Sequence, residues 1–95
     1  MTRISLSEAK KLVASWSKGT FPTVSESIKY HFMRHGRETV ASDVWQYLRK
    51  ADAFRRSLRG AEITNLEGRT VRYTKKGYYL IKEGGGKILS FGTER

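Results

Sequence analysis

At Gly60 the spacing of apolar residues in this 95-residue chain changes from a helical period to a strand-like one. Before Gly60, apolar residues recur every three or four positions, which is typical of helices that bury one face. After Gly60, short alternating runs are separated by glycines, as in a succession of antiparallel hairpins. This order favours an α+β fold in which N-terminal helices pack on one face of a four-stranded antiparallel sheet.

Three helices are predicted in the first part, and each has a polar residue suited to capping its first turn. They should cover residues 6–16, 23–35 and 43–58, with the second ending at Gly36. The capping residues are Ser5, Thr23 and Asp43, followed three positions later by Glu8, Glu26 and Gln46. A Glu or Gln at this distance can complete a capping box, so the helix starts are well marked.

Four strands are predicted after Gly60. They should cover residues 61–66, 69–74, 78–82 and 87–91, with hairpin loops at 74–77 and 83–86. A chain of this length supports one modest core. Residues 1–95 are therefore expected to form a single domain, with a helical part over 1–59 and a sheet over 60–92.

The charge of the chain indicates a polyanionic partner. Nineteen Lys and Arg residues face nine Asp and Glu residues, which gives a formal net charge of +10 at pH 7. In a small domain, so many positively charged side chains repel one another. A phosphate backbone is the usual partner that neutralises them. An anionic membrane is a weaker alternative, because the basic residues are spread along the whole chain rather than gathered on one amphipathic helix.

Composition excludes several classes of protein. The chain has no Cys, so disulfides, thiolate metal sites and cysteine nucleophiles are excluded. No apolar run approaches the roughly 20 residues that cross a bilayer, so no stable membrane insertion is expected.

The only two histidines, His31 and His35, lie four positions apart in the second predicted helix. On a helical wheel both fall on the stripe formed by Val24, Ile28 and Phe32, so both imidazoles should face the core. Histidine suits proton transfer near neutral pH. The alternative to a catalytic role is that both are structural side chains, partly buried and with their hydrogen bonds satisfied. A shared metal ion is a weaker alternative, because no third ligand stands at a recognisable spacing.

Residues that could hold RNA occur beside the histidines, on the third helix and in the sheet. They are Lys29, Arg34, Arg37, Arg49, Lys50, Arg69, Arg72, Tyr73, Lys75 and Lys76. Lys and Arg neutralise phosphates, and tyrosine rings stack on bases. In the second strand Val71 should face the helices, so Arg72 should face the open side of the sheet. The alternative for each cation is a solvated surface position.

RNA cleavage requires little from a protein because the substrate carries its own nucleophile, the 2′-hydroxyl. A base removes the hydroxyl proton, an acid protonates the leaving 5′-oxygen, and cations stabilise the phosphoryl oxygens. One histidine with cations and hydroxyl groups is sufficient. The paired acidic residues of two-metal nucleases are missing, since Glu38 and Asp43 are expected to be a loop residue and a helix cap.

The stretch from Ser27 to Gly36 reads SIKYHFMRHG, and YLRKA follows from Tyr47 to Ala51. The first stretch resembles a segment of bacterial toxin nucleases written roughly S-I-x-Y-H-F-x-K-H-G. Together with the helix and sheet that follow, residues 20 to 91 resemble the Barnase–EndoU–Colicin–RelE (BECR) superfamily. Within it, the chain is similar to C-terminal tRNase domains of contact-dependent growth inhibition toxins and to colicin-like tRNases.

The resemblance implies a toxin endonuclease that cleaves RNA, commonly tRNA, without a metal ion or other cofactor, and leaves a 2′,3′-cyclic phosphate. It also implies a cognate acidic immunity protein. Such a domain would be delivered as the C-terminal part of a larger secreted or cell-surface toxin and would act in the cytoplasm of a target bacterial cell.

Individual positions carry the resemblance to different degrees. His31 and His35 match the paired histidines of the family segment. Arg34 stands where Lys is common, which keeps the charge and changes its geometry. Ser90 matches the family's final Thr, whereas Gly92 replaces the second of two aromatic residues.

We therefore expect His35 to be the principal acid or base, with His31 second. Arg72, Tyr73 and Ser90 would complete the catalytic group. Two other classes remain open at this point: a non-catalytic RNA- or DNA-binding module that uses the same basic face, and a protein-interaction adaptor for an acidic partner.

Overall fold

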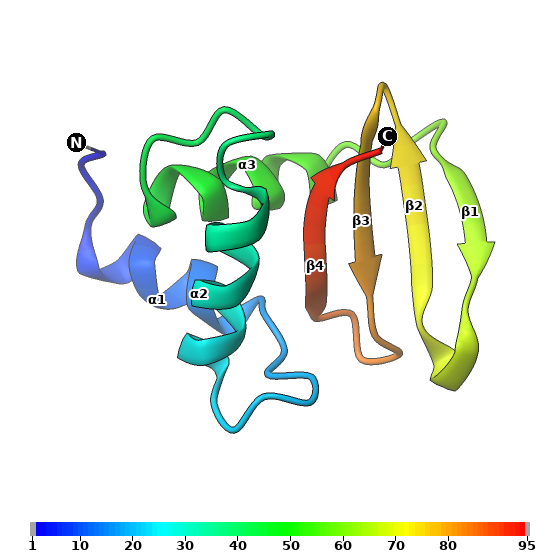
Figure 1. The fold of residues 1–95 in the computed structure, drawn as a ribbon, viewed down its shortest axis with the longest axis horizontal. Helices are drawn as coiled ribbons and strands as arrows, with labels where there is room; N and C mark the ends of the chain where they lie inside the picture. Colours follow the sequence, from blue (N-terminus) through cyan, green and yellow to red (C-terminus); the bar gives the residue numbers. More distant parts are fainter. Residues whose placement is uncertain (1, 95) are drawn as a thin grey trace.

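A computed structural model describes residues 2–94 of the chain and confirms the predicted fold class. Three helices pack against a four-stranded antiparallel sheet. Figure 1 shows the helices gathered beside β4, with β1 at the far edge of the sheet. The BECR label stays a prediction.

The helices are α1 (Leu6–Ala14), α2 (Val24–His35) and α3 (Val44–Arg55). Each starts at the capping residue that the sequence predicted: the side chains of Ser5, Thr23 and Asp43 accept hydrogen bonds from the third backbone N–H that follows. Each bond satisfies a backbone donor that has no partner inside the helix. The three helix starts are thus set by local sequence.

Two helices are shorter than predicted. The first ends at Ala14 rather than Trp16, because Trp16 leaves the helix and forms a parallel bridge with Ile88 of β4. The buried Trp16 side chain joins the core there. The third helix ends at Arg55, before the predicted position 58.

The strands are β1 (Glu62–Asn65), β2 (Val71–Lys75), β3 (Tyr78–Lys82) and β4 (Ile88–Thr93), paired in chain order as a meander. The predicted start of the second strand at Arg69 is wrong. Arg69 lies in the short 3-10 helix η1 (Glu67–Arg69) with φ +67°, a left-handed backbone that cannot continue a strand.

Because side chains alternate across a strand, the register divides the sheet into two faces. The Leu80 face carries Val71, Tyr73, Tyr78, Leu80 and Phe91, and the Tyr79 face carries Arg72, Thr74, Tyr79, Ile81, Ser90 and Gly92. α3 packs on the Leu80 face, where Phe54 meets Tyr78 and Phe91. Arg72 lies on the opposite face, as predicted.

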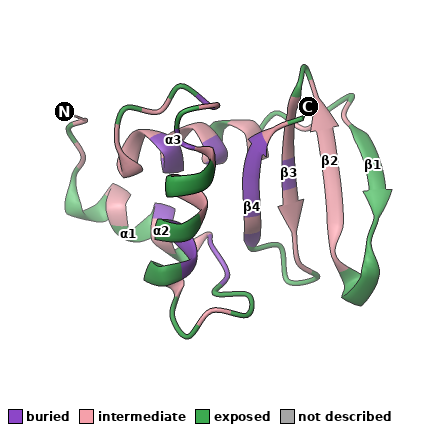
Figure 2. Ribbon diagram, in the orientation of Figure 1, coloured by how far each residue is buried: buried purple, intermediate pink, exposed green. Residues whose placement is uncertain are grey.

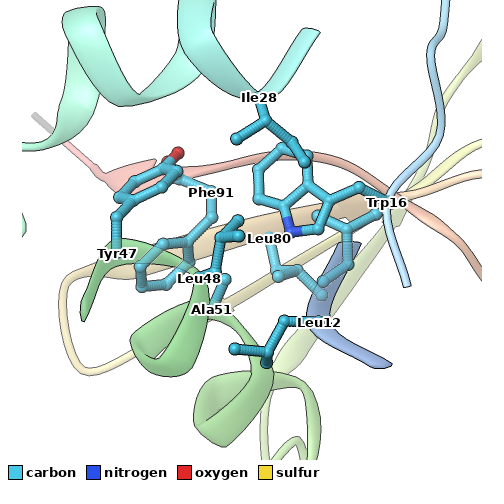
Figure 3. Packing of buried hydrophobic residues seen from close by; sticks show 9 residues of the cluster. Leu12, Trp16, Ile28, Tyr47, Leu48, Ala51, Leu80 and Phe91 are labelled. Carbon is cyan, nitrogen blue, oxygen red and sulfur yellow. The ribbon is translucent and has the colours of Figure 1, made fainter. Parts of the chain in front are cut away.

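The core lies between the helices and the β4 side of the sheet. Figure 3 shows its buried residues, among them Trp16, Tyr47, Leu80 and Phe91. The Tyr47 hydroxyl donates a hydrogen bond to the carbonyl of Phe91, which ties α3 to β4. Burial falls steadily from β4 to β1, which is exposed along its whole length (Figure 2).

Within residues 2–94, none of the helices has the length and apolar character that crossing a membrane requires.

Candidate active site

His35 occupies the last position of α2, where the helix meets the Tyr79 face of the sheet. Its side chain is only 12% exposed, and both ring nitrogens have partners. Nδ1 lies 3.0 Å from Glu38 Oε2, and Nε2 lies 3.2 Å from the Tyr79 hydroxyl. The imidazole is therefore held at both ends.

The carboxylate of Glu38 anchors this arrangement. Besides His35, its Oε2 atom accepts hydrogen bonds from the backbone N–H of Thr93 at 2.7 Å and from the Thr93 hydroxyl at 3.0 Å. Burial works against its charge, but the bonds from Thr93 and His35 prevail, and the pKa of Glu38 lies below its ordinary value. Glu38 is thus ionised at neutral pH.

An ionised carboxylate can only accept hydrogen bonds, so Nδ1 of His35 carries the hydrogen that points at Glu38. In neutral His35, Nε2 then has a free lone pair and accepts from the Tyr79 hydroxyl. The Tyr79 oxygen in turn lies 3.0 Å from Ser90 Oγ. Glu38, His35, Tyr79 and Ser90 form one chain of hydrogen bonds, called the His35 relay below.

Gly92 makes the close approach of these groups possible. A Cβ atom at Gly92 would lie 2.8 Å from His35 Nδ1, Glu38 Oε2 and Tyr79 Cε2 alike. Any larger residue would push the end of α2 away from the sheet. The glycine at this position thus has a structural reason.

A cation completes the site on the same face of the sheet. The guanidinium carbon of Arg72 lies 4.3 Å from the centre of the Tyr79 ring, and its NH2 group lies 3.4 Å from Glu94 Oε2. The predicted pair of His35 and Arg72 is brought together through Tyr79. Ser90 also lies in this group.

His31 lies one turn earlier and is surrounded by aromatic rings. Its ring centre is 5.8 Å from Trp16, 5.2 Å from Tyr30 and 6.1 Å from His35, with which it stacks nearly parallel. Its buried Nδ1 has no hydrogen-bond partner among residues 2–94. Burial, and then the nearby charges of His35 and Arg34, lower the pKa of His31 to about 4. His31 is therefore neutral at physiological pH.

Tyr73, another predicted catalytic residue, lies on the Leu80 face, away from the relay. Lys82 sits over its ring at 5.3 Å. The alternation of β2 makes this unavoidable, because adjacent residues of a strand point to opposite faces. The structure therefore separates Tyr73 from Arg72 and His35.

The predicted phosphate-binding residues lie in different parts of the structure. Arg34 and Arg37 are exposed near the end of α2, and Arg34 lies 3.4 Å from the Tyr30 hydroxyl. Lys29 lines a shallow hollow between α2 and α3. Arg49 is held by Glu8 and by the carbonyl of Arg3. Arg69 lies in the turn before β2, far along the sheet from α2.

The last three predicted phosphate-binding residues, Lys50, Lys75 and Lys76, gather on the Leu80 face. They line one groove between α3 and the loop that joins β2 to β3.

Three members of the site were missed at the level of sequence: Glu38, Tyr79 and Thr93. Glu38 was expected to be a loop residue only, although its position three residues after His35 could have marked it as a partner within one helical turn. No catalytic role was predicted for Tyr79. No local pattern distinguishes Thr93.

Within residues 2–94, no three His, Cys, Asp or Glu side chains come together in a way that could hold a metal ion. Comparison of the chain with protein-family models, curated proteins and solved structures gave no match.

Proposed function

We propose that this chain is a ribonuclease of the bacterial toxin type that cleaves RNA through its own 2′-hydroxyl. The observation that supports this most directly is the His35 relay, in which an imidazole is held between an ionised carboxylate and a phenolic hydroxyl. Imidazoles oriented by a carboxylate act as general bases in many hydrolytic sites. The net charge of +10 supports a polyanionic substrate.

In the proposed reaction, the substrate 2′-hydroxyl gives its proton to the Tyr79 oxygen while the Tyr79 hydroxyl proton moves to Nε2 of His35. The 2′-oxygen then bonds to phosphorus, the bond to the 5′-oxygen breaks, and that oxygen takes up a proton from water. The products are a 2′,3′-cyclic phosphate and a free 5′-hydroxyl. No metal ion is required, because the base, the orienting hydroxyls and a cation all come from this chain.

The other members of the site have distinct roles in this proposal. Glu38 keeps the hydrogen of His35 on Nδ1 and stabilises the imidazolium that forms. Tyr79 and Ser90 orient the ribose hydroxyl. Arg72 stabilises the charge that builds on the phosphoryl oxygens.

The finer part of the proposal comes from the resemblance to BECR toxins. It makes tRNA the expected substrate and an acidic immunity protein the expected inhibitor. It also makes the chain the C-terminal part of a larger delivered toxin that acts in the bacterial cytoplasm. The basic surface suits both an RNA and an acidic protein partner.

The test is incubation of the purified protein with total bacterial RNA in EDTA, beside the His35→Ala variant, with products separated on a denaturing gel. Discrete tRNA-sized fragments from the native protein alone are expected. Cleavage by both proteins would contradict the role of His35. Intact RNA in both lanes would contradict the ribonuclease and favour a non-catalytic binding module or an adaptor.

A further inference from the structure

A groove of about 340 Å³ lies between α3 and the β2–β3 hairpin, on the face of the sheet opposite the His35 relay. Its apolar floor includes the rings of Phe54 and Tyr78, which lie 6.0 Å apart. All the charged residues that line it are lysines: Lys50, Lys75 and Lys76. The volume is at the lower end of the range of small-molecule sites, roughly 300–1000 Å³.

Lys75 is held in place at the edge of this groove. Its ammonium group donates to the carbonyls of Ser57 and Arg59, both at 2.7 Å. An ammonium has three hydrogens, so one donor remains for a ligand. Because the side chain is already ordered, a bound anion would not have to immobilise it.

Lys76 has an unfavourable backbone for its residue type. Lys76 and Gly77 form the two-residue turn between β2 and β3, with φ +52° and +83°. Such turns favour Asn or Gly, because a side chain at positive φ is strained. Lys76 is one of three described non-glycine residues with positive φ, besides Val40 and Arg69, and strain retained in this turn suggests a use for the Lys76 side chain. The use that the surroundings offer is a cation at the mouth of the groove.

We propose that this groove binds an unpaired nucleotide of an RNA strand, with the base against Phe54 and Tyr78. The neighbouring phosphates contact the three lysines of the lining, Lys50, Lys75 and Lys76. Rings flanked by cations are the usual means of holding single-stranded nucleic acid. The inference rests on the proposed function for the choice of RNA as ligand. The groove is separate from the relay, so it would bind the strand away from the bond that is cut.

The test measures binding apart from cleavage. Fluorescence anisotropy of a labelled short oligouridylate is followed with the His35→Ala protein in EDTA over a series of salt concentrations. The same protein carrying Lys50→Ala and Lys76→Asn is compared with a matched control carrying Lys10→Ala and Lys18→Ala, which removes the same charge from exposed positions outside the groove.

The groove variant should bind about tenfold more weakly than the control, and its salt dependence should fall by about 0.7 for each lost lysine contact. Equal affinity and equal salt dependence in the two proteins would overturn the proposal. So would equal affinity for the single strand and for its duplex with oligoadenylate, because a paired base cannot enter the groove. Displacement of the oligouridylate by polyglutamate at equal charge would instead assign the groove to an acidic protein.

The single substitution Lys76→Asn provides a second test of the proposed groove. It should raise the midpoint of thermal unfolding by a few degrees, since Asn suits the turn, while it weakens oligouridylate binding. Weaker binding with lower stability would overturn the role of the strained turn.

The two proposals can fail separately. Binding that depends on the groove without any cleavage by the native protein would refute the ribonuclease and keep the groove. Cleavage by the native protein, together with unchanged binding in the groove variant, would refute the groove and keep the ribonuclease.

Discussion

His31 and His35 lie one helical turn apart with nearly parallel rings, yet they belong to two different regions of the molecule. His31 packs among Trp16, Phe21 and Tyr30, and its buried Nδ1 has no hydrogen-bond partner among the described residues. His35 has a carboxylate on one nitrogen and a hydroxyl on the other. The first environment opposes a charged imidazole, whereas the second gives both ring nitrogens polar partners.

This difference teaches that position on a helix face does not determine what a histidine can do. Both rings are turned toward the interior by the same helical period. Only at His35 do the turn after α2 and strand β3 supply polar partners, because Gly92 of β4 leaves room for them.

The largest expected effect comes from the same substitution at each histidine. His35→Phe should lower the rate of RNA cleavage by about 10²–10⁴-fold, the usual contribution of a general base. His31→Phe should keep the native rate, because a neutral, surrounded ring takes no part in the proton transfer. The measurement is initial-rate cleavage of labelled tRNA in EDTA, after circular dichroism has shown that both variants fold. Equal losses of cleavage rate in the two variants would contradict the proposed difference between His31 and His35.

The next effect tests whether Glu38 sets the tautomer of His35. Glu38→Gln should lower the cleavage rate by roughly 10²-fold, because the Gln amide can donate to Nδ1 and move the ring hydrogen to Nε2. Nitrogen chemical shifts of the imidazole should show this exchange of tautomers, which a purely structural loss would not produce. Glu38→Asp, which keeps the charge, is the control. An unchanged tautomer in the Gln variant would refute the role of Glu38.

A third effect concerns the room that Gly92 provides. Gly92→Ala should lower the free energy of unfolding by about 1–3 kcal/mol, because its Cβ would overlap His35, Glu38 and Tyr79. It should also lower the cleavage rate. Gly85→Ala is the matched control, because no atom lies within 4 Å of the Cβ position there. Urea unfolding monitored by tryptophan fluorescence measures both variants, and equal stability would contradict the close packing of the relay.

The last effect, which concerns stability alone, is a pH dependence that belongs to His31. Its pKa is about 4 in the folded chain and 6.5 in the unfolded one, so above pH 6.5 both states are neutral and the shift has no effect. As the pH falls from 6.5 to 4, the unfolded chain takes up a proton that the folded chain does not. The free energy of unfolding should therefore decrease over this range.

The loss should be about 2 kcal/mol, less than the full shift implies, because His31 is partly exposed and water screens its charge. Urea unfolding at several pH values between 7 and 4 measures it. His31→Phe should remove this part of the pH dependence, whereas the response of Glu38 is common to both proteins and cancels. A variant that loses stability with pH as steeply as the native chain would show that His31 is not desolvated.

Much of the fold followed from local pattern. The three capping residues, the change at Gly60 and the four strands were all predicted, because each depends on contacts within a few residues or on the alternation of one strand. The errors arose at element ends. Trp16 and Arg69 were assigned to regular elements by their neighbours, but a bridge to β4 and a left-handed turn decided otherwise.

The candidate site was predicted only in part. His35 and Arg72 were selected by residue type and face, and Ser90 by the resemblance to BECR toxins. The structure brings the three together around Tyr79. Tyr73 was selected as well, and the alternation of β2 puts it on the other face. Glu38 and Thr93 were not selected, because their importance comes from a contact between residues 55 positions apart.

By itself, the sequence of this protein determined the order of helices and strands, the strong positive charge and the inward orientation of both histidines. These properties depend on local periodicity and composition. Only the tertiary structure decided which histidine has polar partners. His35 meets Tyr79 across 44 residues of chain, and that contact exists because packing of the core sets the end of α2 against β4 at a glycine.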